Sequence, residues 1–316
     1  MLDSASKAFF HTLAQSRSLK SLASRYGMRS PRSFARRFIA GEQVAEAIEA
    51  ARAVEALGMM HTLDLLGESV ATLEQAESAT REYLGVIDAI AQAGVGRGIS
   101  LKLTQLGLDV DKATAVDNLR KILEIAERLG FFIRIDMENS PYIDITLEIF
   151  ETLWDQGHRQ IGVVLQSALY RSEKDLERMN ALGASVRLVK GAYKEPKTVA
   201  YQRKADVDAA YVRMLQMLLS HGHRPAIATH DPAMIESACR YAQEEGIGQD
   251  RFEFQMLYGI RRDLQSALVA RGYRVRVYIP FGRQWFPYFM RRLGERPANV
   301  GFVLRAILRE EVDGAG

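Results

Sequence analysis

The sequence predicts an α/β protein of the (β/α)₈ class, a TIM-like barrel. Eight short apolar runs alternate with longer segments in which apolar residues recur at helical spacing. The runs are continuous instead of alternating, which is typical of parallel strands buried on both faces. The chain has 316 residues, enough for one barrel of about 250 residues and an extension.

The predicted strands are short and rich in Val, Ile, Leu and Phe. They span residues 59–65, 99–103, 131–137, 160–166, 184–190, 225–230, 252–257 and 275–279. The predicted helices span residues 41–57, 73–93, 114–129, 144–156, 174–182, 206–220, 232–245 and 263–270. Helices of crossover length between consecutive strands favour a parallel barrel.

A doubly wound sheet is the main alternative fold. That fold carries a GxGxxG pattern in its first strand-to-helix turn, and the sequence contains no such pattern. The nearest glycine cluster, AGVGRG at residues 93–98, comes before a predicted strand instead of after one. It therefore indicates the end of a helix and not a phosphate-binding loop.

The composition excludes several classes of protein. Hydrophobic residues make up 47% and charged residues 26% of the chain, which is ordinary for a globular protein. Cys239 is the only cysteine, so an intramolecular disulfide and a cysteine-based zinc site are excluded. No apolar stretch approaches the roughly 18 residues of a membrane span. We predict a cytoplasmic protein with no metal site and, at a net charge of +3, no nucleic-acid partner.

The beginning of the chain is basic and rich in serine. Against the single acidic residue Asp3 stand the cations Lys7, Arg17, Lys20, Arg25, Arg29, Arg32, Arg36 and Arg37. We therefore divide the chain into a basic helical arm, residues 1–41, and a barrel domain, residues 42–316. Three interpretations of the arm stay open: a transit peptide, a surface for acidic lipid on the inner face of a membrane, and a pair of solvated helices.

Polar side chains mark the ends of nearly all predicted strands, which is where barrels carry their chemistry. The residues are Asp64, Lys102, Asp136, Gln166, Arg187, Lys190, Thr229, His230, Gln255 and Tyr278. Any one of them alone could belong to a structural ion pair. A buried charge without a partner costs several kcal/mol, by order of magnitude. Lys102, Asp136 and Arg187 are therefore expected to partner one another or a ligand.

Two other functions fit a barrel with basic residues at its rim. Lys102 or Lys190 could form the Schiff base of a lysine-dependent lyase. A non-catalytic module could instead use the basic residues to bind anions. The cations Arg187, Lys190, Arg291 and Arg292 better suit a large anionic cofactor together with a substrate carboxylate.

Eight segments, in order along the chain, resemble the motifs of the proline dehydrogenases. They are SLKLTQLGL (100–108), IRIDME (133–138), VVLQSALYR (163–171), RLVKGAY (187–193), IATHD (227–231), FEFQMLYG (252–259), VRVYIPFG (275–282) and YFMRRLGE (288–295). The likeness extends from about residue 59 to residue 303, and the arm matches only loosely. The chain is similar to monofunctional members of the family.

The resemblance implies a flavin enzyme that oxidises L-proline to 1-pyrroline-5-carboxylate and passes the electrons to a quinone. It implies an FAD site at Met137, Gln166, Lys190, Gly191, Ala192, Thr229 and His230. It implies substrate binding by Lys102, Tyr278, Tyr288, Arg291 and Arg292, and catalytic roles for Asp136 and Arg187. Tyr193 and Leu257 are expected to complete the wall of the substrate pocket.

Three further expectations concern the substrate. Tyr288 leaves room for an unsubstituted ring, which favours proline over hydroxyproline. The cations Lys102, Arg291 and Arg292 should lower the pKa of the substrate amine by repulsion. Glu68 follows the first strand and could pair with Arg291 or Arg292 as a latch over the site.

Overall fold

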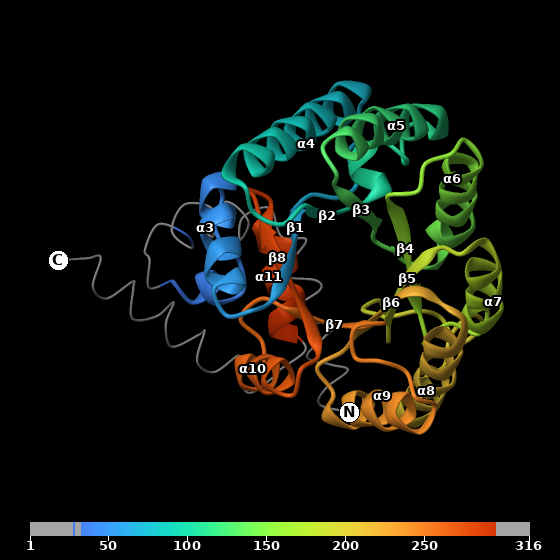
Figure 1. Cartoon of the computed structure of the whole chain (residues 1–316). Coiled ribbons are helices and arrows are strands. Elements are labelled where there is room, and N and C mark those ends of the chain that lie inside the picture. Colours follow the sequence, from blue (N-terminus) through green and yellow to red (C-terminus); the bar gives the residue numbers. More distant parts are fainter. Residues whose placement is uncertain (1–27, 29–32, 295–316) are drawn as a thin grey trace, which may run out of the picture.

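The structure, a computed structural model, describes Met28 and residues 33–294. Eight parallel strands form a closed barrel in the order β1 to β8, surrounded by helices (Figure 1). The strands are β1 Met60–Leu65, β2 Gly98–Leu101, β3 Phe132–Ile135, β4 Ile161–Gln166, β5 Ser185–Val189, β6 His223–Ala228, β7 Glu253–Leu257 and β8 Arg274–Phe281. The predicted fold class is confirmed.

All eight predicted helices form, with ends that differ from the predicted ones by at most a few residues. The helices are α3 Val44–Glu55, α4 Leu73–Ala93, α5 Lys112–Arg128, α6 Ile143–Asp155, α7 Ser172–Leu182, α8 Lys204–His221, α9 Pro232–Glu244, α10 Arg262–Ala270 and α11 Trp285–Gly294. Short 3₁₀ helices are η1 Phe34–Arg37, η2 Leu103–Leu106 and η3 Ser140–Tyr142. Within the described residues, no helix has both the length and the apolar character of a membrane span.

Capping side chains, a glycine and a proline mark the helix ends. Thr72 caps α4 and Asp111 caps α5, since each side chain accepts a hydrogen bond from a backbone N–H of the first turn. Gly94 ends α4 with a positive φ of 69°, so the AGVGRG segment is a helix end, as predicted. Asp231 caps α9, and Pro232 occupies its first position.

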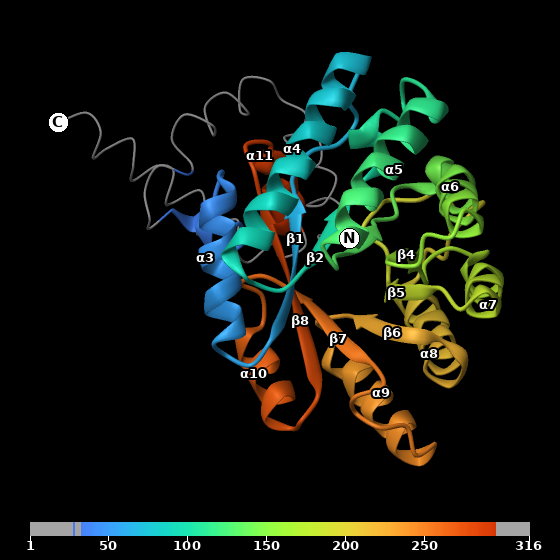
Figure 2. The same ribbon diagram turned by 45° about the horizontal axis from the view of Figure 1, so that its top comes forward.

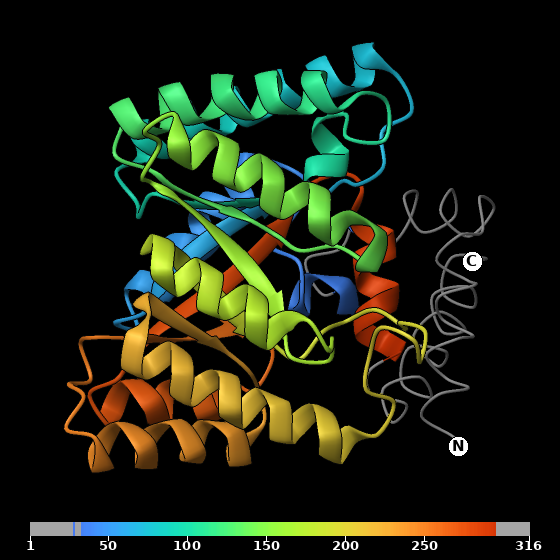
Figure 3. The same ribbon diagram turned by 90° about the vertical axis from the view of Figure 1, so that its right-hand side faces the viewer.

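The outer face of β8 and β1 is covered by helix α3, which precedes the barrel, and not by helix α11, which follows β8. Helix α3 precedes β1 and packs against both β1 and β8 on the outside of the barrel (Figure 1). Helix α11 begins just after β8 ends at Phe281 and lies beyond the carboxyl ends of the strands (Figures 2 and 3). Because α3 already covers the outer groove, α11 is available to cover the mouth.

A second hydrophobic cluster joins α11 to the segment that precedes α3. It contains Met28, Ala35, Phe38, Ile39, Leu66, Trp285, Tyr288, Phe289 and Met290. Backbone hydrogen bonds from Ala40 N to Pro280 O and from Gly282 N to Gly41 O, both 2.9 Å, fix the segment to the end of β8. Most of the predicted arm, residues 1–27 and 29–32, lies outside the described residues.

Four predicted strands extend one or two residues too far at their carboxyl ends, and two of these ends bear on Lys102 and Asp136. Strand β2 ends at Leu101, and Lys102 already caps the 3₁₀ helix η2. Strand β3 ends at Ile135, so Asp136 lies in the loop that follows. The apolar pattern continues across both ends because these loop residues are buried against the barrel mouth. The polar residues of interest therefore lie where strands turn into loops.

Candidate active site

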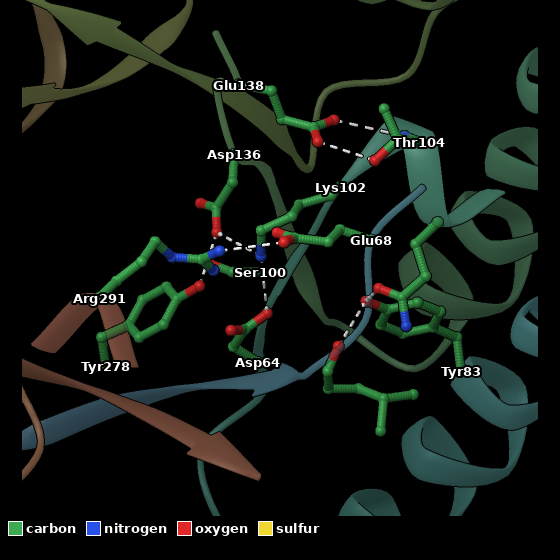
Figure 4. A network of polar contacts seen from close by, with 12 residues as sticks. Asp64, Glu68, Tyr83, Ser100, Lys102, Thr104, Asp136, Glu138, Tyr278 and Arg291 are labelled. Atoms are coloured by element: carbon green, nitrogen blue, oxygen red, sulfur yellow. Dashed lines mark hydrogen bonds and ion pairs between the residues drawn. The ribbon is translucent and has the colours of Figure 1, made fainter. Parts of the chain in front are cut away.

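Asp136 is the centre of a polar cluster at the carboxyl mouth of the barrel (Figure 4). Its Oδ1 accepts a hydrogen bond of 2.7 Å from Arg187 Nη1, and its Oδ2 accepts one of 2.6 Å from the Tyr278 hydroxyl. Lys102 Nζ lies 3.9 Å from Oδ2. Strands β3, β5 and β8 and the loop after β2 thus bring together Lys102, Asp136 and Arg187, as the sequence analysis expected.

Lys102 lies between two carboxylates, because Asp64 contributes a second one. Lys102 Nζ is 3.5 Å from Asp64 Oδ1, and the Asp64 side chain is only 1% exposed. Burial alone would lower the pKa of Lys102, but Asp64 and Asp136 outweigh it and raise that pKa. Burial raises the pKa of Asp64. Lys102 is therefore a fixed ammonium group at neutral pH.

Arg187 is held from three sides. Besides Asp136, its Nε donates to Gln255 Oε1 at 2.5 Å and its Nη2 donates to Ser100 Oγ at 3.0 Å. Its guanidinium carbon lies 5.3 Å from the centroid of the Tyr278 ring. A guanidinium with its donors engaged in this way has one orientation, so Arg187 presents a positive charge of fixed position.

The two arginines of α11 face different partners. Arg291 Nη1 donates to Glu68 Oε1 at 3.0 Å, which is one of the two pairings expected for Glu68 (Figure 4). The Arg292 guanidinium carbon lies 5.2 Å from the centroid of the Tyr288 ring. Tyr288 belongs to the second hydrophobic cluster with Trp285. The arginines thus do not form one parallel fork.

The residues predicted to hold a cofactor lie at the ends of β4, β5 and β6. Gln166 Nε2 donates to the backbone oxygen of Glu138 at 2.9 Å. Gly191 follows β5 with a φ of +116°, and a Cβ placed on it would lie 3.1 Å from Gln166 Oε1. His230 Nε2 accepts a hydrogen bond of 2.9 Å from Leu257 N, so its other ring nitrogen is a donor.

The remaining predicted cofactor residues adjoin this group. Lys190 Nζ pairs with Asp208 at 2.5 Å and with Asp231 at 2.8 Å. Thr229 Oγ1 accepts a hydrogen bond from Asp231 N at 3.1 Å. Met137 is buried directly after Asp136, and Ala192 follows Gly191. The carboxyl ends of neighbouring strands thus gather these residues along one side of the mouth.

Glu138 is a site residue to which the sequence analysis gave no role. Its Oε1 accepts a hydrogen bond of 2.7 Å from the Thr104 hydroxyl, and its Oε2 accepts one of 3.3 Å from Thr104 N (Figure 4). Burial raises its pKa to about 6. Ser100 was likewise not singled out, whereas Asp64 and Gln255 were named among the polar residues at the strand ends but were given no role. The feature of the sequence that could have identified such residues is a polar side chain within or directly after an otherwise apolar strand.

The lysine environments argue against a Schiff-base lyase. A lysine nucleophile must lose its proton, which requires a lowered pKa. Lys102 shows the opposite shift, because two carboxylates stabilise its charged form. Lys190 is also paired with two carboxylates. Among residues 33–294, no group of three or more His, Cys, Asp and Glu side chains is placed to hold a metal ion.

Fold and site together define a class: a (β/α)₈ barrel whose mouth carries cations of fixed position. The family model described as proline dehydrogenase matches residues 47–305. The proline dehydrogenase of Deinococcus radiodurans is 44% identical over 88% of this chain and 91% of its own length. Proline dehydrogenase 2 of Bacillus subtilis is 41% identical over 96% of this chain and 98% of its own length.

The structural comparison agrees with these matches. The crystal structure of proline utilization A from Bdellovibrio bacteriovorus, inactivated by N-propargylglycine, superposes with a TM-score of 0.77 at 28% identity. The superposition covers 82% of this chain and 32% of the proline utilization A chain. The chain belongs to the proline dehydrogenase family, and it is therefore an oxidoreductase of proline catabolism. The family resemblance inferred from the motifs is confirmed.

Proposed function

We propose that the protein catalyses the FAD-dependent oxidation of L-proline to 1-pyrroline-5-carboxylate. The observation that carries the proposal is the cluster at the barrel mouth: a guanidinium and an ammonium, fixed by Asp136, beside a second guanidinium on α11. Fixed cations of this kind suit a substrate carboxylate and an anionic cofactor. Asp136 and Arg187 are the proposed catalytic residues.

In the proposed complex, Arg291 and Arg292 bind the carboxylate of proline. Arg291 already engages the carboxylate of Glu68, which supports its ability to bind a second carboxylate of the same geometry. A charge-assisted hydrogen bond of this kind contributes about 1.5–3 kcal/mol. Lys102, Tyr278 and Tyr288 complete the substrate pocket in this proposal.

The protonation of the substrate amine follows from the same charges. An amine must be neutral before its nitrogen lone pair can assist removal of a hydride from the neighbouring carbon. The ammonium of Lys102 and the guanidinium groups of α11 lower the pKa of a nearby amine by repulsion. Both oxygens of Asp136 already accept hydrogen bonds, so Asp136 orients Lys102 and Arg187 and is not assigned as a base.

The residues around Gly191 fit a flavin nucleotide. Gly191 has a positive φ, and a Cβ added there would lie only 3.1 Å from Gln166 Oε1, so this is a close backbone passage that only glycine accommodates without strain. Gln166, Lys190, Thr229 and His230 bring donors and acceptors to the same rim, with Met137 and Ala192 beside them. FAD, when bound, supplies at N5 the acceptor for the hydride of proline C5.

A further part of the proposal concerns the fate of the electrons. The chain corresponds to 24% of the length of bifunctional protein PutA of Escherichia coli, and to nearly the whole of the Bacillus protein. We infer that a quinone accepts the electrons. A peripheral contact of the basic residues 1–41 with the inner face of a membrane would bring the enzyme to that acceptor.

Identification of the cofactor and the product tests the proposal. The purified protein should release FAD on denaturation, and turnover of L-proline should yield pyrroline-5-carboxylate, both identified by mass spectrometry. Release of no flavin, or turnover of hydroxyproline in preference to proline, would contradict the proposal.

A further inference from the structure

A chain of polar side chains runs from the site down through the barrel interior. Arg187 Nε donates to Gln255 Oε1 at 2.5 Å, and Gln255 Nε2 donates to Glu253 Oε1, also at 2.5 Å. Arg276 donates to both oxygens of Glu253, from Nε at 2.7 Å and from Nη2 at 2.9 Å. Asp136 at the mouth is thus linked through two side chains, Arg187 and Gln255, to the Glu253–Arg276 ion pair near the opposite end.

This row of hydrogen-bonded side chains borders an open cavity and not a packed core. Barrel interiors are usually filled by layers of branched apolar side chains. Here a cavity of about 1600 Å³ at the amino ends of the strands is lined by Arg187, Gln255, Glu253 and Arg276, among others. Below Arg187 there is therefore room for its side chain to move when it loses its fixed partners.

Glu253 determines which end of the Gln255 amide faces Arg187. An amide has an acceptor oxygen and a donor NH₂ group, and the two ends are nearly equal in shape. A carboxylate at Glu253 accepts only, so it draws the NH₂ group toward itself and leaves the oxygen for Arg187 Nε. Burial raises the pKa of Glu253, but Arg276 outweighs it and lowers that pKa, so the carboxylate is charged at neutral pH.

We propose that Glu253 is a positioning residue for the oxidation reaction. Through Gln255 it holds Arg187 in the orientation in which Nη1 reaches Asp136. Without Glu253 the amide can reverse, its NH₂ group opposes Arg187 Nε, and Arg187 moves toward the cavity. The inference rests on the proposed function and adds one element to it: the charge of Arg187 would lie beside the bound flavin ring, where a fixed cation favours the anionic reduced form.

The test uses a paired substitution, Glu253→Leu together with Arg276→Met. Replacing both members of this partly buried ion pair by apolar residues removes the two opposite charges together, which is often neutral for stability. Gln255→Leu breaks the same link while both members of the ion pair stay in place, and serves if the paired variant does not fold. Glu55→Gln is the matched control, because Glu55 lines the same cavity and pairs with His61 but not with Arg187.

The readout is the midpoint potential of the bound flavin, measured anaerobically against a reference dye, together with the melting temperature. We expect the paired variant and Gln255→Leu to shift the flavin reduction equilibrium at least tenfold toward the oxidised form. For a two-electron couple this is about 30 mV. Glu55→Gln should leave the potential unchanged. In a protein that already carries Arg187→Met, the paired substitution should give no further shift, because it acts only through Arg187.

Two results would overturn the inference, and they differ. If Arg187→Met shifts the potential while the paired variant and Gln255→Leu do not, Glu253 has only a structural role and the proposed function stands. If Arg187→Met itself leaves the potential unchanged, the role proposed for Arg187 fails, and the inference built on it fails too.

Discussion

Arg187 and Asp136 meet at 2.7 Å at the barrel mouth, one from β5 and the other from the end of β3. Each orients the other, since Arg187 has further acceptors in Gln255 and Ser100 and Asp136 has a further donor in Tyr278. The pair is 6% and 13% exposed at its two side chains, so solvent screens it little. The geometry of the site depends on this pair.

Asp136→Asn should therefore lower the activity strongly, although the side chain hardly changes in shape. The substitution keeps the volume but removes the charge that orients Arg187 and Lys102. Misplacement of a catalytic group by about 1 Å can cost on the order of 10²-fold, and we expect kcat/KM for proline to fall by about that factor. Steady-state kinetics check this, with the exposed Asp144→Asn as control. Activity within a factor of about three of the wild type would contradict it.

Arg291→Lys should weaken substrate binding although the charge is kept. Lysine cannot reproduce the planar fork of a guanidinium. With about 1.5–3 kcal/mol at stake, KM for proline should rise by roughly 10- to 150-fold. The surface variant Arg120→Lys should leave KM unchanged. An unchanged KM in Arg291→Lys would show that the substrate carboxylate binds elsewhere.

Glu68→Ala should change the rates of proline binding. Because Glu68 pairs with Arg291 at 3.0 Å, it competes with the substrate carboxylate for the same guanidinium. Stopped-flow measurements should find faster association of proline with the variant, whereas Glu77→Ala, on the exposed face of α4, should bind at the wild-type rate. Identical binding kinetics in both variants would remove the latch from the account.

Gly191→Ala should weaken FAD binding, and the chain offers a matched control. Gly191 and Gly157 both have positive φ, +116° and +99°, so alanine is strained at either position, at a cost of about 1–3 kcal/mol. Only at Gly191 would the added carbon meet Gln166; nothing lies within 4 Å at Gly157. Titration of the apoproteins with FAD should find a weakened FAD affinity in Gly191→Ala and the wild-type affinity in Gly157→Ala. Equal FAD affinity would mean that the passage beside Gly191 holds no cofactor.

Glu138 should make the protein less stable as the pH rises from about 4.5 to about 6. Its folded-state pKa is raised to about 6 by burial, from an ordinary value of 4.5, so in this window the folded protein binds the proton that the unfolded chain has lost. The stability contribution is present below pH 4.5 and is lost through pH 6. It amounts to about 2 kcal/mol. Urea unfolding across this range should show the loss in the wild type and not in Glu138→Gln; parallel curves would contradict it.

The strand pattern was sufficient to predict the barrel and the rim residues. Continuous apolar runs identify strands buried on both faces, and their carboxyl ends must meet at one mouth, so Lys102, Asp136 and Arg187 could be expected together. Their pairing partners could not be predicted. Asp64 and Gln255 lie within apolar strands, and periodicity does not show which buried polar residue faces which neighbour across a barrel.

The arrangement of α3 and α11 was also beyond the sequence. Helical periodicity shows that a segment has an apolar face, but it does not name the surface that the face covers. The packing of α3 on β1 and β8, and of α11 with Phe38 and Ile39, depends on contacts between segments far apart in the chain. Helix geometry alone places Arg291 and Arg292 about 100° apart, but which neighbour each of them meets follows from that packing.

An anaerobic absorbance spectrum, recorded before and after addition of L-proline, tests the central claim most directly. The account predicts a yellow protein with a flavin spectrum that bleaches when proline is added, and that regains its colour with a quinone. A flavin spectrum that does not respond to proline, or no flavin spectrum after incubation with FAD, would contradict it.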